Sequence, residues 1–216
     1  MAFYIWILTS CWPWFRVRVN TRVEDNIVKA LFDGSHSRNL ELIETHPDSP
    51  KIVNAIVEIP KGTAAKYEYN PDLDLFQLDR CLPSSMMYPC SYGFIPSTFA
   101  EDNDPLDILV YNDVPIERGT LVECNVIGVL DMKDSDGRDW KILGTPTSHV
   151  RNYRSIKDID PMFIKVASYF FKHYKDLNNK FVEVNDWHGK QKAHDIIKEC
   201  YERFKYQPDK PLTAIS

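Results

Sequence analysis

The sequence of 216 residues lacks a hydrophobic run that could cross a membrane. Its apolar stretch at residues 3–15 is shorter than the roughly 20 residues that a spanning helix needs, and Pro13 interrupts it. Positive charge follows this stretch at Arg16 instead of preceding it, which does not fit a secretory signal. We therefore expect no membrane partner and a cytoplasmic protein, in which residues 1–50 form a poorly patterned N-terminal extension. A mitochondrial presequence is the alternative, because no acidic residue precedes Glu24.

The sequence also lacks an excess of basic residues and any regular cysteine spacing. The 26 Lys and Arg residues face 31 Asp and Glu residues, so the net charge is −5. A general polyanion-binding surface is not indicated, and we expect no nucleic acid partner. The 5 cysteines form neither a Cys-x-x-Cys pair nor a Cys/His ligand pattern. They predict buried free thiols in a reducing compartment.

Several common catalytic motifs are missing as well. The sequence has no Gly-x-Ser-x-Gly turn and no Cys/His arrangement, which argues against a serine or cysteine nucleophile. It has neither a P-loop nor a Gly-x-Gly-x-x-Gly turn, so nucleotide hydrolysis by that route is unsupported. No internal repeat or low-complexity linker divides the chain, and its length suits one domain with a terminal extension.

What the sequence does have is a dense acidic segment that contains Asp102, Asp104 and Asp107. Carboxylates held this close repel one another unless cations lie between them, and oxygen ligands favour Mg2+ or Mn2+ over zinc. The proline among them places the acids on a loop or a strand end. A calcium loop of the EF-hand type is excluded, because leucine and aspartate stand where that loop needs Asp or Asn and then Gly. For these three acids alone, a solvated acidic turn is the alternative.

Short β-rich segments precede a helical C-terminal third. Strands are predicted at residues 52–59, 65–69, 75–80, 108–111, 121–130, 140–143 and 181–184, with an irregular aromatic segment at residues 88–95. An Asp-Pro pair at residues 160–161 predicts a helix start, and a closing helix is predicted at residues 188–204. Many short strands at hairpin spacing favour a small closed barrel. We therefore predict an α+β protein, mainly β, with its domain at residues 51–206 and a flexible tail at residues 207–216.

A second acidic group follows the first along the chain. Asp134 and Asp139 lie on a predicted loop, and loops of a hairpin-built barrel can gather at one rim. Glu58 and Glu68 add carboxylates to the set. Basic side chains alternate with these acids, namely Lys66, Arg80, Lys141 and Lys175. A site of this composition suits a strongly anionic substrate that arrives with metal, because carboxylates hold the metal and basic groups hold the remaining phosphate oxygens.

The acidic segment Asp102–Asp107 resembles the Asp-x-Asp-Pro-hydrophobic-Asp signature of the family I soluble inorganic pyrophosphatases. Further blocks that resemble the family follow in family order, at residues 57–60, 66–68, 79–80, 88–93, 134–141 and 170–176. The resemblance covers about residues 51–204 and favours the shorter, bacterial-type members. It implies a five-stranded OB-like closed barrel with flanking C-terminal helices. It also implies hydrolysis of pyrophosphate to two phosphates, several Mg2+ ions per active site with Mn2+ as a substitute, and a homo-oligomer.

The resemblance further implies a role for each matching position. Asp104 would accept a proton from the attacking water. The implied metal ligands are Asp102, Asp107, Asp139 and Asp134. The implied substrate contacts are Lys66, Arg80, Tyr92, Tyr174 and Lys175. The implied supporting residues are Glu58, Glu68, Tyr88 and Lys141. Without the resemblance, the tyrosines would be interpreted as core aromatics and Arg80 as part of a surface ion pair.

The chain departs from the family at Ser135, where Glu or Gln is common. The shorter hydroxyl cannot reach as far as those side chains, so we expect altered metal affinity at most. Two alternatives remain beside the enzyme: a degenerate, inactive family member, and a non-catalytic OB-type barrel that binds a polyanion. The second should carry aromatic stacking platforms on a basic face, whereas this chain concentrates acids.

Overall fold

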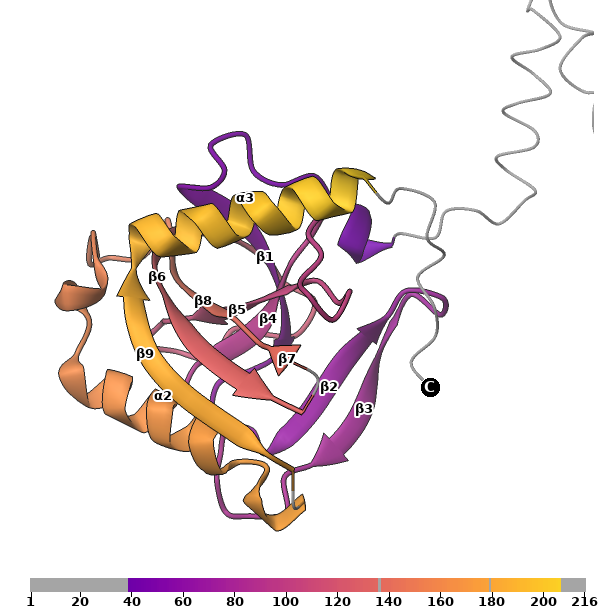
Figure 1. Cartoon of the computed structure of the whole chain (residues 1–216), viewed down its shortest axis with the longest axis vertical. Helices are drawn as coiled ribbons and strands as arrows, with labels where there is room; N and C mark the ends of the chain where they lie inside the picture. The colour runs from indigo at the N-terminus through magenta and orange to yellow at the C-terminus, as the bar shows by residue number, and fades with distance from the viewer. Residues whose placement is uncertain (1–38, 136, 179, 207–216) are drawn as a thin grey trace, which may run out of the picture. The chain divides into compact units, whose positions relative to one another are not determined.

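A computed structural model of the chain describes residues 39–135, 137–178 and 180–206. Five strands form a closed barrel, namely β1 (Ile52–Ile59), β4 (Ser91–Ile95), β5 (Leu106–Val110), β8 (Lys141–Pro146) and β6 (Leu121–Asp134). They pair in the order β1-β4-β5-β8-β6, and β1 pairs with β6 to close the ring (Figure 1). Neighbouring strands are antiparallel except β5 and β8, which are parallel. The prediction of a mainly β, five-stranded closed barrel is confirmed.

The barrel forms because its strands are apolar on nearly every residue. All residues of β4 and β8 are buried, and only the ends of β1 and β6 emerge toward solvent. Strands that are buried on both faces have nearly continuous hydrophobic sequences, and the sequences of these strands show this pattern. β6 is long enough to extend past the barrel, where it pairs with β7 (Gly137–Arg138) and β9 (Val182–Gly189).

Two strands were not predicted, namely β4 and the two-residue β7. The end of β6, which includes Asp134, and β7 lie where a loop was expected. The segment 88–95 was interpreted as irregular, but Ser91–Ile95 forms β4 in the middle of the barrel wall. Gly93 explains the difference, because a Cβ added there would lie 1.8 Å from the backbone oxygen of Ile56. The glycine that weakens the strand signal in the sequence is what allows β4 to approach β1 this closely.

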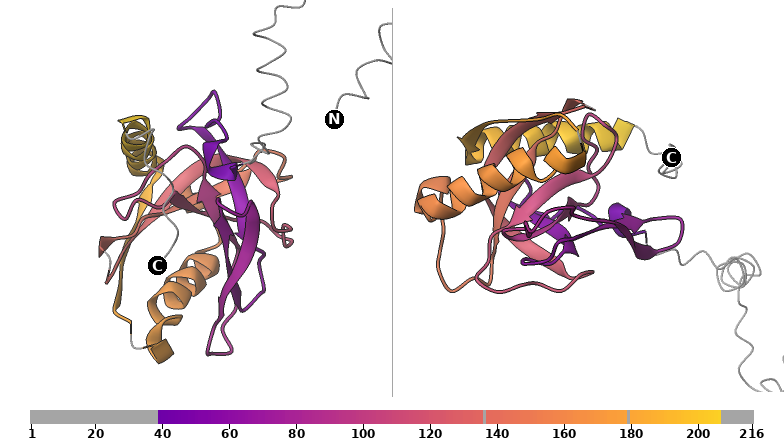
Figure 2. Two further views of the ribbon diagram at one scale, coloured as in Figure 1. Left: turned by 90° about the vertical axis from the view of Figure 1, so that its right-hand side faces the viewer. Right: turned by 90° about the horizontal axis from the view of Figure 1, so that it is seen from below.

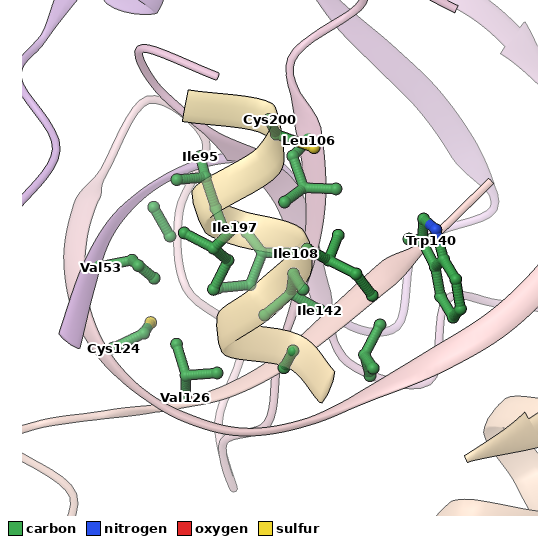
Figure 3. Packing of buried hydrophobic residues seen from close by; sticks show 14 of the residues in the cluster. Val53, Ile95, Leu106, Ile108, Cys124, Val126, Trp140, Ile142, Ile197 and Cys200 are labelled. Atoms are coloured by element: carbon green, nitrogen blue, oxygen red, sulfur yellow. The ribbon is translucent and has the colours of Figure 1, made fainter. Parts of the chain in front are cut away.

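Two helices flank the barrel. Asp160 is the N-cap of α2 (Pro161–His173). Its side chain accepts a hydrogen bond from the amide of Met162, as the Asp-Pro pair predicts. α3 (Lys190–Tyr206) covers one end of the barrel, where Ile197 and Cys200 lie among apolar side chains of the strands (Figure 3). α2 packs near β9 on another side (Figure 2). The predicted closing helix began too early, because His188 pairs with β6 as part of β9.

A separate two-stranded hairpin stands beside the barrel (Figure 1). It consists of β2 (Ala65–Asn70) and β3 (Leu75–Cys81). Three short 3-10 helices complete the described elements, namely η1 (Leu40–Leu42), η2 (Ile156–Asp158) and η3 (Asp176–Asn178). No helix of the described residues is long and apolar enough to cross a membrane.

The predicted domain limits stay predictions, because residues 1–38 and 207–216 lie outside the described residues. The prediction of buried free thiols is confirmed for Cys90, Cys124 and Cys200 and is wrong for Cys81, which is free but exposed at the end of β3. Cys11 lies outside the described residues.

Candidate active site

A cavity of about 430 Å³ opens between the barrel rim and the β2–β3 hairpin. Every residue that the sequence analysis assigned to the site lines this cavity, namely Glu58, Lys66, Glu68, Arg80, Tyr88, Tyr92, Asp102, Asp104, Asp107, Asp134, Asp139, Lys141, Tyr174 and Lys175. They come from seven strands and from the segments that follow β3, β4, β7 and α2. The structure therefore brings together acids and bases that lie far apart in the sequence.

The acidic segment owes its shape to local hydrogen bonds. The amide of Ala100 donates to the carbonyl oxygen of Asp104 at 2.8 Å, and the amide of Asp104 donates to the Asp102 carboxylate at 3.1 Å. Between them Asn103 adopts a positive φ of 68°, a conformation that Asn tolerates better than most residues. This tight turn presents the carboxylates of Asp102 and Asp104 to the same cavity.

Sheet register places Asp107 beside Lys141. The two residues are paired neighbours in the parallel β5–β8 pair, and their side chains contact each other. The Lys141 ammonium also contacts Asp139 and donates a hydrogen bond to the Tyr92 hydroxyl at 3.1 Å. Only 4% of the Lys141 side chain is exposed, so the barrel holds a buried ammonium group between two carboxylates. A buried charge is tolerated when it is paired and hydrogen-bonded in this way.

Negative charge is crowded around this ammonium group. Burial, followed by the charges of Asp102 and Asp107, raises the pKa of Asp104 to about 6. Burial also raises the pKa of Asp102 and, against the attraction of Lys141, that of Asp139. These raised pKa values mean that the ionised acids are disfavoured, first by burial and then by neighbouring carboxylates. Additional cations in the cavity would relieve this repulsion.

Glu58 reaches the cavity from an irregular point in β1. The register between β1 and β4 shifts between Val57 and Ile59, which marks a bulge at Glu58. Bulges re-aim a side chain, and here the Glu58 carboxylate accepts a hydrogen bond from the Tyr69 amide at 2.8 Å. Burial raises the pKa of Glu58 to about 8, with the charge of Asp107 adding to the effect despite this hydrogen bond.

Positive charge lies on the hairpin side of the cavity. Lys66 and Arg80 are paired neighbours across β2 and β3, so their side chains leave the same face of the hairpin. Asp79 holds both, at 3.2 Å from the Lys66 ammonium and 2.7 Å from the Arg80 guanidinium. The Lys175 ammonium, in the segment after α2, lies 2.8 Å from the Asp134 carboxylate. Cations from the hairpin and from this segment thus line the same cavity as the acids.

Aromatic side chains form the floor of the cavity. Tyr88, Tyr92, Phe170, Phe171 and Tyr174 contact one another, with ring centroids 4.8 to 6.3 Å apart. All five are buried. These rings belong to a hydrophobic core cluster, and the low dielectric constant beside them strengthens electrostatic interactions in the site.

The donor set fits hard divalent cations, because carboxylate oxygens dominate it. Among the described residues, however, no three His, Cys, Asp or Glu side chains are already arranged around one point as metal ligands. The contacts of Lys141 account for this, since its ammonium group lies against both Asp107 and Asp139. A cation that used these two carboxylates would require the ammonium group to move aside.

Comparison with known proteins identifies the family. The model of the family described as inorganic pyrophosphatase matches residues 55–205. The inorganic pyrophosphatase of Geobacillus stearothermophilus is 42% identical over 159 residues, which cover 73% of this chain and 96% of that protein. The chain belongs to the inorganic pyrophosphatase family.

Solved structures of the family agree with this assignment. The crystal structure of the inorganic pyrophosphatase from Thermus thermophilus matches with a TM-score of 0.75 and 38% identity, covering 77% of this chain and 99% of that chain. The structure of the Neisseria gonorrhoeae inorganic pyrophosphatase matches with a TM-score of 0.73 and 37% identity, covering 77% and 99%. The resemblance that the sequence motifs indicated is therefore confirmed. The roles of individual residues in this pyrophosphatase stay predictions.

Some residues of the pyrophosphatase cavity were missed in the sequence. Glu41 lines the cavity from η1, in the segment assigned to the poorly patterned extension. Tyr69 also lines it, and the alternation along β2 did not distinguish it from a packing residue. No motif of the sequence singled out these two positions. Asp79 belongs to the block at residues 79–80, but only the fold reveals that it holds Lys66 and Arg80 in place.

Proposed function

We propose that this protein hydrolyses inorganic pyrophosphate to two phosphates with the help of Mg2+. The observation that carries the proposal is the single cavity in which all the predicted carboxylates and cations meet. Membership of the inorganic pyrophosphatase family supports the same reaction. A polyanion-binding barrel without turnover would gain nothing from so many buried acids in its binding site.

Acidic residues of the cavity are proposed to bind metal, and basic residues are proposed to bind phosphate. Asp102, Asp107, Asp139 and Asp134 supply the carboxylates that would hold several Mg2+ ions, with Mn2+ as a substitute. Bound there, the metal ions make water a better nucleophile and neutralise charge on the phosphates. Lys66 and Arg80 bind phosphate oxygens from the hairpin side, while Lys175 and Tyr174 bind them from the α2 side. Charge neutralisation of this kind is the main requirement in phosphoryl transfer.

Asp104 takes the proton of the attacking water. Its pKa of about 6 leaves it mostly ionised at neutral pH and still basic enough to accept a proton. Tyr92 and Glu58 act indirectly. The Tyr92 hydroxyl fixes the Lys141 ammonium, and Glu58, whose pKa of about 8 favours the neutral form at neutral pH, places a buried carboxyl group near Asp107.

Phosphate release from pyrophosphate, with and without Mg2+, tests the proposal. We expect release that depends on the metal and stops when EDTA is added. Absence of metal-dependent release at micromolar protein would contradict it and would favour a degenerate family member. Assembly as a homo-oligomer and a cytoplasmic location stay predictions, which sedimentation velocity and cell fractionation can test.

A further inference from the structure

Glu41 is an unexpected member of the cavity wall. Among the described residues that line the cavity, it alone precedes residues 55–205, which the family model matches. It lies on η1 and is only 7% exposed. The pyrophosphatase site of this chain therefore contains a carboxylate that the family motifs do not supply.

The backbone around Glu41 is fixed on both sides. The amide of Ser97 donates to the Glu41 carbonyl oxygen at 2.7 Å, and the amide of Glu41 donates to the Asn39 side chain at 3.0 Å. The amide of Leu40 donates to the Tyr69 hydroxyl at 3.1 Å. Leu40 on η1 and Ile43 just after it pack against a cluster of the barrel and hairpin that includes Phe94. These contacts, and not the carboxylate itself, hold η1 in position.

The Glu41 side chain is left without a protein partner. Its Oε2 atom is buried and accepts no hydrogen bond from the described residues. Burial raises the pKa of Glu41 to about 7, and the groups that add to this effect, Asp104 and Asp72, are both carboxylates. A buried carboxylate without a partner is costly, and like charges nearby increase the cost. A fold that places it there by other contacts leaves it available for a ligand of positive charge.

We propose that Glu41 binds a divalent cation in the catalytic cavity, with water or phosphate oxygens completing the coordination. Mg2+ is usually held by one or two carboxylates, several waters and substrate phosphates, not by an all-protein cage. One carboxylate without further ligands from the protein is therefore sufficient for such a site. Glu41 lines the same cavity as the predicted substrate contacts, so a cation bound to it would lie near bound pyrophosphate.

The proposed cation site at Glu41 depends on the proposed function only where it assigns phosphate oxygens as ligands of the cation. Cation binding without pyrophosphate can be measured whether or not the protein hydrolyses anything. If wild-type protein releases no phosphate but loses a cation site on substitution of Glu41, only the proposed function fails. If hydrolysis is normal and the substitution leaves cation binding unchanged, only the present proposal fails.

Calorimetric titration of the full chain with Mn2+, without pyrophosphate and at pH 8, tests the site directly. Glu41→Gln keeps the shape of the side chain and removes its charge. We expect this variant to bind one Mn2+ ion fewer than wild type, or one ion about 10- to 100-fold more weakly. Glu44→Gln is the matched control, because Glu44 is exposed on the same segment, and it should bind Mn2+ like wild type. Identical titrations of Glu41→Gln and wild type would overturn the proposal.

Thermal unfolding supplies a second measurement. Without metal, Glu41→Gln should melt at the same temperature as wild type or higher, because it removes an unpartnered buried charge. Mn2+ should then raise the melting temperature of wild type more than that of the variant. An equal Mn2+ effect on both proteins would overturn the proposal. So would a metal-free variant that melts well below wild type, since the carboxylate would then have a stabilising partner within the protein.

Discussion

Asp104→Asn is the sharpest test of the proposed mechanism. Asp104 lies on the tight turn that follows β4, and its side chain accepts none of the hydrogen bonds that shape the turn. We therefore expect the variant to fold with nearly unchanged stability. Loss of a general base costs about 100- to 10,000-fold in rate, which is about 3 to 5 kcal/mol of transition-state stabilisation. The turnover number at saturating Mg2+ should fall by this factor.

The pH dependence gives the same experiment a second readout. A general base must be ionised, so the wild-type kcat/KM should fall about tenfold per pH unit below the Asp104 pKa of about 6. This acid limb should be absent from the residual activity of Asp104→Asn. Glu101→Gln is the matched control, because it removes the same charge from the same turn at an exposed position outside the cavity wall. Near-wild-type turnover of Asp104→Asn with saturating Mg2+ would refute the assignment of the base.

Three further substitutions test how the site is built. Lys141→Met leaves two carboxylates without their buried partner, so the free energy of unfolding in EDTA should fall by about 3–5 kcal/mol and recover in part with Mg2+. Gly93→Ala forces a Cβ against the Ile56 carbonyl oxygen and should lower the free energy of unfolding by about 1–3 kcal/mol in urea titrations. Glu58 has a folded-state pKa of about 8, above its ordinary 4.5, so the folded protein binds more protons than the unfolded chain between these values. The metal-free stability of wild type should therefore fall as the pH rises through this window, and Glu58→Gln should abolish that part of the fall.

Two of these variants have a matched control in the same protein. Lys133→Met removes an exposed lysine of β6 and should change stability little. A Cβ at Gly189 would meet no atom within 4 Å, so Gly189→Ala should be tolerated. Stable Lys141→Met protein in EDTA, or equal stability of Gly93→Ala and wild type, would contradict the packing described here. Parallel pH–stability curves for Glu58→Gln and wild type would show that Glu58 is not the titrating group.

The sequence predicts the residues of the site better than it predicts how the strands around the site pair. The acids of the Asp102–Asp107 segment form a recognisable pattern, and the fold brings every assigned side chain into one cavity. The contact of Lys141 with Asp107 was not predictable, because it depends on the parallel pairing of β5 and β8. Parallel neighbours are set by the whole barrel and leave no signal in either strand alone.

The incorrect predictions for β4 and for Glu41 have the same physical origin. β4 was interpreted as irregular because Gly93 lowers strand propensity, yet the close approach to β1 requires a residue without a side chain. Glu41 was assigned to an extension because its surroundings show no hydrophobic period, yet distant residues such as Ser97 fix its backbone. Tertiary contacts decide both positions, and a local pattern cannot report them.

The ammonium group of Lys141 has a consequence for the choice of ion. Because this group already supplies one positive charge to Asp107 and Asp139, a monovalent ion that took its place would offer the two acids no electrostatic gain. A dication brings one charge more than the ammonium group does. We therefore expect the site to select a dication over sodium or potassium, because a tethered competitor of equal charge already lies between the two acids.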